Sequence, residues 1–153
     1  MDTPEEENRA RIFAEKVLKY KGSSKMKIYL AGGMSFYNDW RDFIYKEFKD
    51  RSIFLDPRNS GSNNEKIYTE YDVNCVKQCD ILFAFMDSSN PSGYGMSVEL
   101  GLAYGLGKFI IFVDQTNFSK KKYFGMHRQM SNEVFKDLQD GVEFLKSLLL
   151  KEQ

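Results

Sequence analysis

Two carboxylates stand where the hydrophobic pattern of the chain calls for apolar residues. Glu99 lies in the stretch NPSGYGMSVELGLAYGLGK, residues 90–108, where Ser97 is the only polar residue within three positions on either side. A helix of this composition has almost no polar face, so its glutamate is expected to be buried. Asp72 occupies an inward position of a second predicted helix. The stripe that it interrupts consists of Tyr68, Tyr71, Cys75, Val76 and Cys79.

Two buried carboxylates close together favour chemistry that needs an ionised group beside a protonated one. Burial and mutual repulsion raise the pKa of at least one member of such a pair. The ionised carboxylate can then attack the anomeric carbon of a glycoside, while the other group protonates the leaving group. The pair therefore predicts glycosyl transfer. Two simpler interpretations stay open: Glu99 could complement the helix dipole from a first turn, and Asp72 could reach water or a backbone amide from a helix edge.

The elements that must position these residues alternate between strand and helix. Buried strands are predicted at residues 27–31, 53–55, 81–86, 109–113 and 134–135. Helices are expected between them, one of them capped by Asn38, and a last one over residues 140–150. This order predicts an α/β fold with three layers, a doubly wound and mainly parallel five-stranded sheet of the flavodoxin/Rossmann-like kind.

The chain divides into a short N-terminal segment and one domain. Residues 1–24 read as an amphipathic helix followed by a linker, and residues 25–153 as a single domain. Residues 116–128 show no clear period and are interpreted as a mobile surface segment. Ligands of doubly wound sheets bind at the carboxyl ends of the strands, so the Gly32-Gly33 turn, the turn at residues 56–59 and the loop at residues 87–96 are expected to form the site.

The composition of the chain limits the kinds of binding partner that it is expected to have. The 22 basic and 22 acidic residues cancel, so neither a nucleic acid polymer nor a membrane surface is an expected partner, and the ligand is expected to be a small molecule. Cys75 and Cys79 read as reduced core residues, which favours a cytoplasmic setting. No apolar run approaches the ~18 residues of a membrane span. No metal-ligand spacing is found, lone His127 reads as structural or surface, and no metal or cofactor is expected.

Three stretches of the chain resemble the nucleoside 2-deoxyribosyltransferase family. They are IYLAGGMSF, YDVNCVKQCDILFAF and GYGMSVELGLAYGLGK, which lie in the family's order within residues 27–113. The resemblance implies an enzyme that cleaves or exchanges the N-glycosidic bond of a (2′-deoxy)nucleoside or nucleotide through a covalent glycosyl-glutamate intermediate. It implies that Glu99 is the nucleophile, that Tyr29 orients its carboxylate, and that Asp72 handles the proton on the departing or arriving base.

Position at the carboxyl ends of the strands, together with the resemblance, predicts which residues contact the substrate. These are Gly32, Gly33, Ser35, Asp56, Arg58, Ser92, Gly93, Gly95 and Met96. Many transferases have an aspartate that grips the sugar 5′-hydroxyl where this chain has Gly93. The neighbouring Ser92 is similar to the phosphate-binding serines of the related 2′-deoxynucleoside 5′-monophosphate N-hydrolases. This difference favours a nucleotide as the substrate. A nucleoside 2-deoxyribosyltransferase stays the first expectation, such a hydrolase is the second, and a non-catalytic nucleotide-binding sensor module is the third.

The aromatic content points to association of the chain with itself. Its 13 Phe and 9 Tyr exceed what one small core readily buries, so a homodimer or larger homo-oligomer is expected. The family resemblance implies that a neighbouring subunit completes the site. Met126, His127 and Asn132 are the candidates for that contribution.

Overall fold

A computed structural model gives the structure of the chain, and it describes residues 3–5, 8–9, 11–12, 15, 26–33, 39–87, 93–116 and 122–150. The described residues between 4 and 15 are helical, as the N-terminal pattern predicts. The division into a separate N-terminal segment and a domain from residue 25 stays a prediction. None of the helices in the described part of the chain has the length and apolar character needed to cross a bilayer.

Five strands form one sheet in the order β2-β1-β3-β4-β5, and every neighbouring pair is parallel. The strands are β1 (Ile28–Gly32), β2 (Phe54–Leu55), β3 (Ile81–Asp87), β4 (Phe109–Gln115) and β5 (Glu133–Phe135). Their nearly continuous apolar sequences are typical of parallel strands that are covered on both faces. The predicted five-stranded, doubly wound α/β fold is confirmed, and the strand order is that of flavodoxin-like folds.

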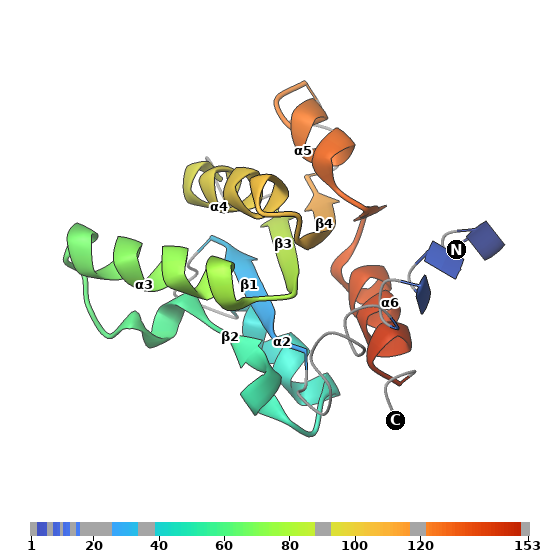
Figure 1. Ribbon diagram of the computed structural model, residues 1–153, viewed down its shortest axis with the longest axis horizontal. Coiled ribbons are helices and arrows are strands. Elements are labelled where there is room, and N and C mark those ends of the chain that lie inside the picture. Colours follow the sequence, from blue (N-terminus) through green and yellow to red (C-terminus); the bar gives the residue numbers. More distant parts are fainter. Residues whose placement is uncertain are drawn as a thin grey trace.

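Helices cover both faces of the sheet (Figure 1). They are α2 (Trp40–Glu47), α3 (Glu65–Gln78), α4 (Tyr94–Gly105), α5 (Gly125–Met130) and α6 (Leu138–Leu150), with short 3-10 turns η1 (Arg51–Ile53) and η2 (Pro57–Ser60). Alternate residues of β1 show the division: Ile28 and Leu30 join the core beneath α2 and α6, whereas Tyr29 and Ala31 join the core beneath α3 and α4. The phenol of Tyr29 is thereby aimed at the α3–α4 layer.

Two local expectations change. Residues 116–128 were interpreted as a mobile surface segment, but residues from 125 on form the start of α5, and Phe124 before them is buried against Phe112 at a ring-centroid distance of 6.1 Å; residues 117–121 lie outside the described part of the chain. Helix α2 is capped by Asp39, whose carboxylate accepts from the backbone N–H of Arg41. The predicted cap, Asn38, lies outside the described residues.

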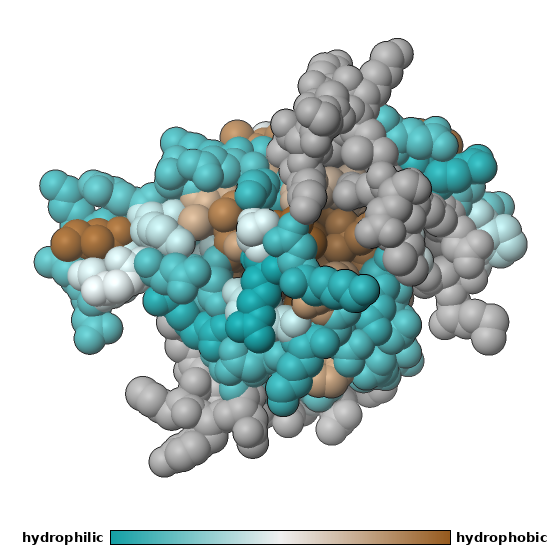
Figure 2. Space-filling model, turned by 90° about the horizontal axis from the view of Figure 1, so that it is seen from below, coloured by the Kyte–Doolittle hydropathy of each residue, from teal (hydrophilic) through white to brown (hydrophobic). Residues whose placement is uncertain are grey.

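The surface seen in Figure 2 is mainly hydrophilic, and hydrophobic residues gather towards the middle of this face. This distribution is ordinary for a domain whose apolar side chains fill two core layers on either side of a sheet.

Gly32 ends β1 at a point where no side chain fits. A Cβ built there lies 2.8 Å from the carbonyl oxygen of Phe85 and 2.8 Å from Cζ2 of Trp40. We expect Gly32→Ala to lower the free energy of unfolding by about 1–3 kcal/mol, measured by urea denaturation, because the neighbouring strand and the indole must move. Gly101→Ala is the control: its Cβ meets nothing within 4 Å in the interior of α4, so this change should leave stability equal or higher. Equal losses at both positions would contradict the close approach at Gly32.

Candidate active site

A pocket of about 650 Å³ opens between α3 and α4 at the carboxyl ends of the strands. Its floor includes Gly32, the last residue of β1, and Gly33 after it, and one wall is the first turn of α4 after β3. The strand order reverses between β1 and β3, and doubly wound sheets bind ligands at such a point. A volume of this size lies within the usual range for small-molecule sites.

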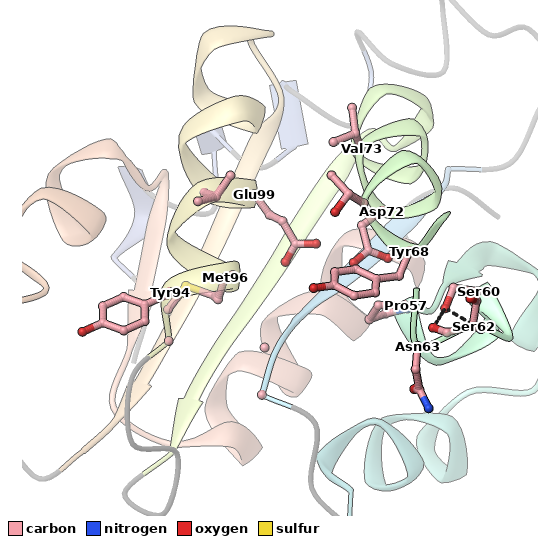
Figure 3. Close-up of a pocket in the computed structure, with 16 residues that line it drawn as sticks. Pro57, Ser60, Ser62, Asn63, Tyr68, Asp72, Val73, Tyr94, Met96 and Glu99 are labelled. Carbon is pink, nitrogen blue, oxygen red and sulfur yellow. Dashed lines mark hydrogen bonds between the residues drawn. The ribbon is translucent and has the colours of Figure 1, made fainter. Parts of the chain in front are cut away.

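Glu99 projects into this pocket from the second turn of α4 (Figure 3). The first turn of α4 contains no acidic residue, so the alternative in which Glu99 serves the helix dipole from a first turn is excluded. The carboxylate is partly buried, and its Oε2 accepts a hydrogen bond from the hydroxyl of Tyr29, which is fully buried in β1. This hydrogen bond fixes the orientation of the Glu99 carboxylate.

Asp72 projects into the same pocket from α3, on the side opposite Glu99 (Figure 3). Its side chain is partly buried, and its Oδ1 is shielded from solvent without a hydrogen bond to any residue that the structure describes. Buried carboxylate oxygens are usually satisfied, so this oxygen is available to a ligand. The structure thus brings together Glu99, Tyr29 and Asp72, which the sequence singled out from three separate elements.

Burial sets the protonation of the three groups. Burial raises the pKa of Glu99 to about 7; the hydrogen bond from Tyr29 opposes this rise, and the charge of Asp72 adds to it. Burial likewise raises the pKa of Asp72 to about 6, and the positive charge of Arg41 opposes the rise. Burial, together with the Glu99 carboxylate, raises the pKa of Tyr29 far above its ordinary value, so this phenol stays a hydrogen-bond donor. Both carboxyl groups can therefore change protonation near neutral pH.

Comparison with known proteins decides the family. The family model described as nucleoside 2-deoxyribosyltransferase matches residues 28–140 of this chain. The chain belongs to the nucleoside 2-deoxyribosyltransferase family. A search of curated protein sequences finds no match.

The solved structures that are similar to this one include two enzymes. One is a 2-desoxiribosyltransferase from Leishmania mexicana, with a TM-score of 0.57 and 19% sequence identity over 78% of this chain and 96% of that one. The other is the CMP N-glycosidase BcmB from Clostridium botulinum, with a TM-score of 0.49 and 19% identity over 78% of this chain and 97% of that one. At this identity the Leishmania enzyme supports the shared fold. Family membership supports an enzyme that transfers or hydrolyses at the N-glycosidic bond of small nucleoside substrates.

Five residues that were predicted to contact the substrate line the pocket of this nucleoside 2-deoxyribosyltransferase family member. They are Gly32, Gly33, Gly93, Gly95 and Met96. Gly93 has a φ of +67°, a left-handed conformation that favours glycine, and a Cβ there would lie 2.8 Å from Sδ of Met86. Ser35 and Ser92, expected at the same edge, lie outside the described residues.

Asp56 and Arg58 were also predicted to bind substrate, but the structure places neither in the pocket lining. The buried carboxylate of Asp56 accepts from Nη2 of Arg58 at 2.7 Å and from the hydroxyl of Tyr45 at 2.6 Å. Arg58 also pairs with Asp42 at 3.2 Å. The two residues hold the β2–η2 turn to α2, and Pro57 between them is the one that reaches the pocket.

The three candidates for a contribution across a subunit boundary have different surroundings. His127 Nε2 lies 2.6 Å from Oγ of Ser97 in the same chain, and Ser97 in turn donates to the carbonyl of Gly93 at 2.8 Å. Asn132 Oδ1 accepts from the backbone N–H of Ile110 at 2.8 Å, at the start of β4. Met126 is 74% exposed. Within the described structure, His127 thus contacts the first turn of α4 through Ser97, and Asn132 links the start of β5 to the start of β4.

Sequence analysis missed the far wall of the pocket and the cation beneath its floor. The wall is formed by Ser60, Ser62, Asn63, Tyr68, Thr69 and Val73. Their polar and aromatic types resemble those of any exposed loop and helix start, so no pattern in the sequence marks them as pocket residues. Arg41 is fully buried under the Gly32-Gly33 turn. Its spacing of three from Ile44 on the inward stripe of α2 was a usable signal.

Proposed function

We propose that this protein cleaves the N-glycosidic bond of a 2′-deoxynucleoside through a covalent glycosyl ester on Glu99 and passes the sugar to a second base, as a nucleoside 2-deoxyribosyltransferase. The observation that carries the proposal is the Glu99 carboxylate, held by a buried tyrosine hydroxyl and facing the pocket opposite Asp72. A half-buried, oriented carboxylate with a raised pKa is suited to attack carbon, because little solvent has to be removed from it first.

The proposed reaction has two steps. In the first, ionised Glu99 attacks the anomeric carbon while the bond to the base breaks, and Asp72 gives its proton to the departing base. This leaves a glycosyl ester on Glu99 and an ionised Asp72. In the second, an incoming base attacks the same carbon and releases Glu99, and Asp72 recovers a proton from that base. A water molecule in place of the incoming base would complete a hydrolysis.

The charges around the pocket favour an uncharged nucleoside over a 5′-monophosphate. Among the described residues that line the pocket there is no lysine, arginine or histidine. The sequences MSFYN at residues 34–38 and SSNPS at residues 88–92, which follow β1 and β3, contain none either. A phosphate would meet two carboxylates without an exposed cation, and this repulsion weakens binding.

Product analysis tests the proposal. The purified protein is incubated with a deoxynucleoside, or with its 5′-monophosphate, in the presence and absence of a second free base, and the products are separated by chromatography. We expect a new deoxynucleoside only when the second base is present. Free sugar with or without added base would assign the hydrolase instead. Turnover confined to the monophosphate would overturn the choice of an uncharged substrate.

The pH dependence follows from the two carboxyl groups. The first step needs Glu99 ionised and Asp72 protonated, and the pair titrates with pKa values of about 7 and about 6. We expect a bell-shaped profile of kcat/KM with its maximum at roughly pH 6–7, because activity is lost when Glu99 is protonated at low pH and when Asp72 is ionised at high pH. The profile is measured with one deoxynucleoside between pH 4.5 and 9. A flat profile across this range would contradict the assignment of roles.

We further propose that α4 packs against a second copy of the chain. Its outward side chains are apolar: Tyr94 is 79% exposed, Val98 70% and Tyr104 57%. Tyr94 and Val98 also border the pocket, so association would cover its open side. We expect light scattering to give at least a dimer, and Tyr104→Lys to shift the protein towards monomer. Gln139→Lys, on the opposite side of the sheet in α6, should leave the mass unchanged; a monomeric wild type contradicts the proposal.

A further inference from the structure

Arg41 is the second residue of α2, and none of its side-chain surface is exposed. Arginine is rarely buried completely unless its charge and its N–H groups are matched. The guanidinium lies over the ring of Trp40, with 4.6 Å between its central carbon and the ring centroid. The hydrogen-bond acceptors of the guanidinium lie towards the end of β1.

The guanidinium donates to three carbonyl oxygens at the end of β1. Nε donates to Leu30 at 3.1 Å, Nη2 to Gly32 at 3.0 Å and Nη1 to Gly33 at 3.1 Å. Gly32 and Gly33 line the pocket, and Leu30 directly follows Tyr29, which holds Glu99. A rigid, planar group with several donors suits this task, because it fixes the carbonyls relative to one another.

The guanidinium of Arg41 shares its neighbouring carboxylates with Arg58. Asp39 accepts from Nη1 at 3.2 Å, and Asp56 lies 3.8 Å from Nε but gives its closer contact, at 2.7 Å, to Arg58. The described pocket lining holds two carboxylates and no cation. The positive charge beneath the floor opposes the rise in the pKa of both Glu99 and Asp72.

We propose that Arg41 is a positioning residue of this active site: it clamps the end of β1 that forms the pocket floor, and it supplies from below the positive potential that the catalytic carboxylates need. Its catalytic meaning rests on the proposed function of Glu99, but its electrostatic effect on that carboxyl group does not. The titratable and charged groups around it are Tyr29, Asp39, Asp56, Arg58, Asp72 and Glu99.

The test measures the titration of Glu99 directly. Carboxyl carbons are labelled with ¹³C in the full chain, the Glu99 signal is assigned with Glu99→Gln, and its titration is followed by NMR in wild type, Arg41→Met and Arg41→Lys. We expect Arg41→Met to move the titration to higher pH, and Arg41→Lys to leave it near wild type, because lysine keeps the charge but loses the fork. Arg58→Met is the matched control, since it breaks ion pairs in the same cluster outside the pocket, and its titration should not move.

Kinetics separate the two parts of the role. We expect Arg41→Met to lower kcat/KM about tenfold more at pH 6 than at pH 8, because the lost charge leaves more of Glu99 protonated at pH 6. Arg41→Lys keeps the charge but displaces the pocket floor. We therefore expect it to lower kcat about tenfold at every pH and to leave KM within threefold of the wild-type value. An unmoved Glu99 titration in folded Arg41→Met, or an equal shift in Arg58→Met, would overturn the proposal. If Arg41→Met does not fold, Asp39→Asn provides the test. It keeps the hydrogen bond that caps α2 but removes a negative charge beside Arg41, so the titration of Glu99 should move to lower pH. An unmoved titration of Glu99 in Asp39→Asn would overturn the proposal. A shifted titration in a protein without glycosidase activity would refute the proposed function alone.

Discussion

Glu99→Gln should lower turnover of a deoxynucleoside by on the order of 10⁴-fold or more, without loss of the folded state. The amide keeps the size of the side chain and can still accept the hydrogen bond from the Tyr29 hydroxyl, but it cannot form the glycosyl ester. The measurement is kcat by chromatography of released base. Glu70→Gln, on the exposed side of α3, is the matched control and should keep wild-type activity.

The same variant should be more stable than wild type in alkaline solution. The pKa of Glu99 is raised from its ordinary value to about 7 in the folded state, so ionisation of Glu99 costs stability as the pH rises from about 4.5 through 7. Glu99→Gln lacks this cost, and we expect its free energy of unfolding to exceed that of wild type by about 1–3 kcal/mol at pH 8 and to match it near pH 4. A variant less stable at pH 8 would show that the carboxylate is a structural partner.

A covalent adduct separates the enzyme from a non-catalytic sensor. A nucleoside with fluorine at C2′ of its sugar reacts slowly. It should add the mass of that sugar to the peptide that contains Glu99, which mass spectrometry after digestion detects. Binding of nucleosides without any adduct or product would favour the sensor, because such a module keeps the pocket and loses the chemistry. The stability effect of Glu99→Gln would persist in either case, since it depends only on burial.

The fold could be predicted because its strands are marked by their own residues. Ile81–Met86 and Phe109–Val113 are apolar throughout, which few structures other than a doubly covered parallel sheet accommodate. The helix α5 could not be predicted in the same way. It is short, and it forms because Phe124 and His127 pack on Phe112, which is a contact between distant residues that no local period records.

The two carboxylates that line the pocket could be singled out for a related reason: each breaks a pattern. Glu99 has no polar face to occupy, and Asp72 interrupts an apolar stripe, so their types alone raise the question of function. Asp56 and Arg58 show the opposite case. Their position after β2 is typical of residues that contact substrate. In the structure, however, the two side chains form an ion pair beside the pocket, and the sequence does not indicate this pairing. The burial of Arg41 could have been inferred from its spacing of three from Ile44 on the inward stripe of α2, but its partners, which are backbone carbonyls of β1 and the following turn, leave no mark in the sequence.

Asp72→Asn should slow the enzyme by about 10²–10⁴-fold with a natural deoxynucleoside and by less than about tenfold with a nucleoside whose base leaves readily without protonation. Asparagine preserves the shape of the side chain but has no proton to transfer at neutral pH. The measurement compares kcat/KM for the two substrates. Tyr68→Phe, at the same pocket wall, is the matched control, because a change that only disturbs binding should slow both substrates alike.

The pH profile of Asp72→Asn tests the same role independently. Under the proposed mechanism, wild-type activity should fall at high pH because Asp72, whose pKa is raised to about 6 by burial, ionises, and it should fall at low pH because Glu99 is protonated. With the activated substrate, Asp72→Asn should therefore lose the high-pH decline and keep the low-pH one. The remaining low-pH limb should then report the pKa of Glu99 itself, which the charge of Asp72 no longer raises. Equal slowing of both substrates with an unchanged bell would mean that Asp72 positions the base and that its proton comes from elsewhere.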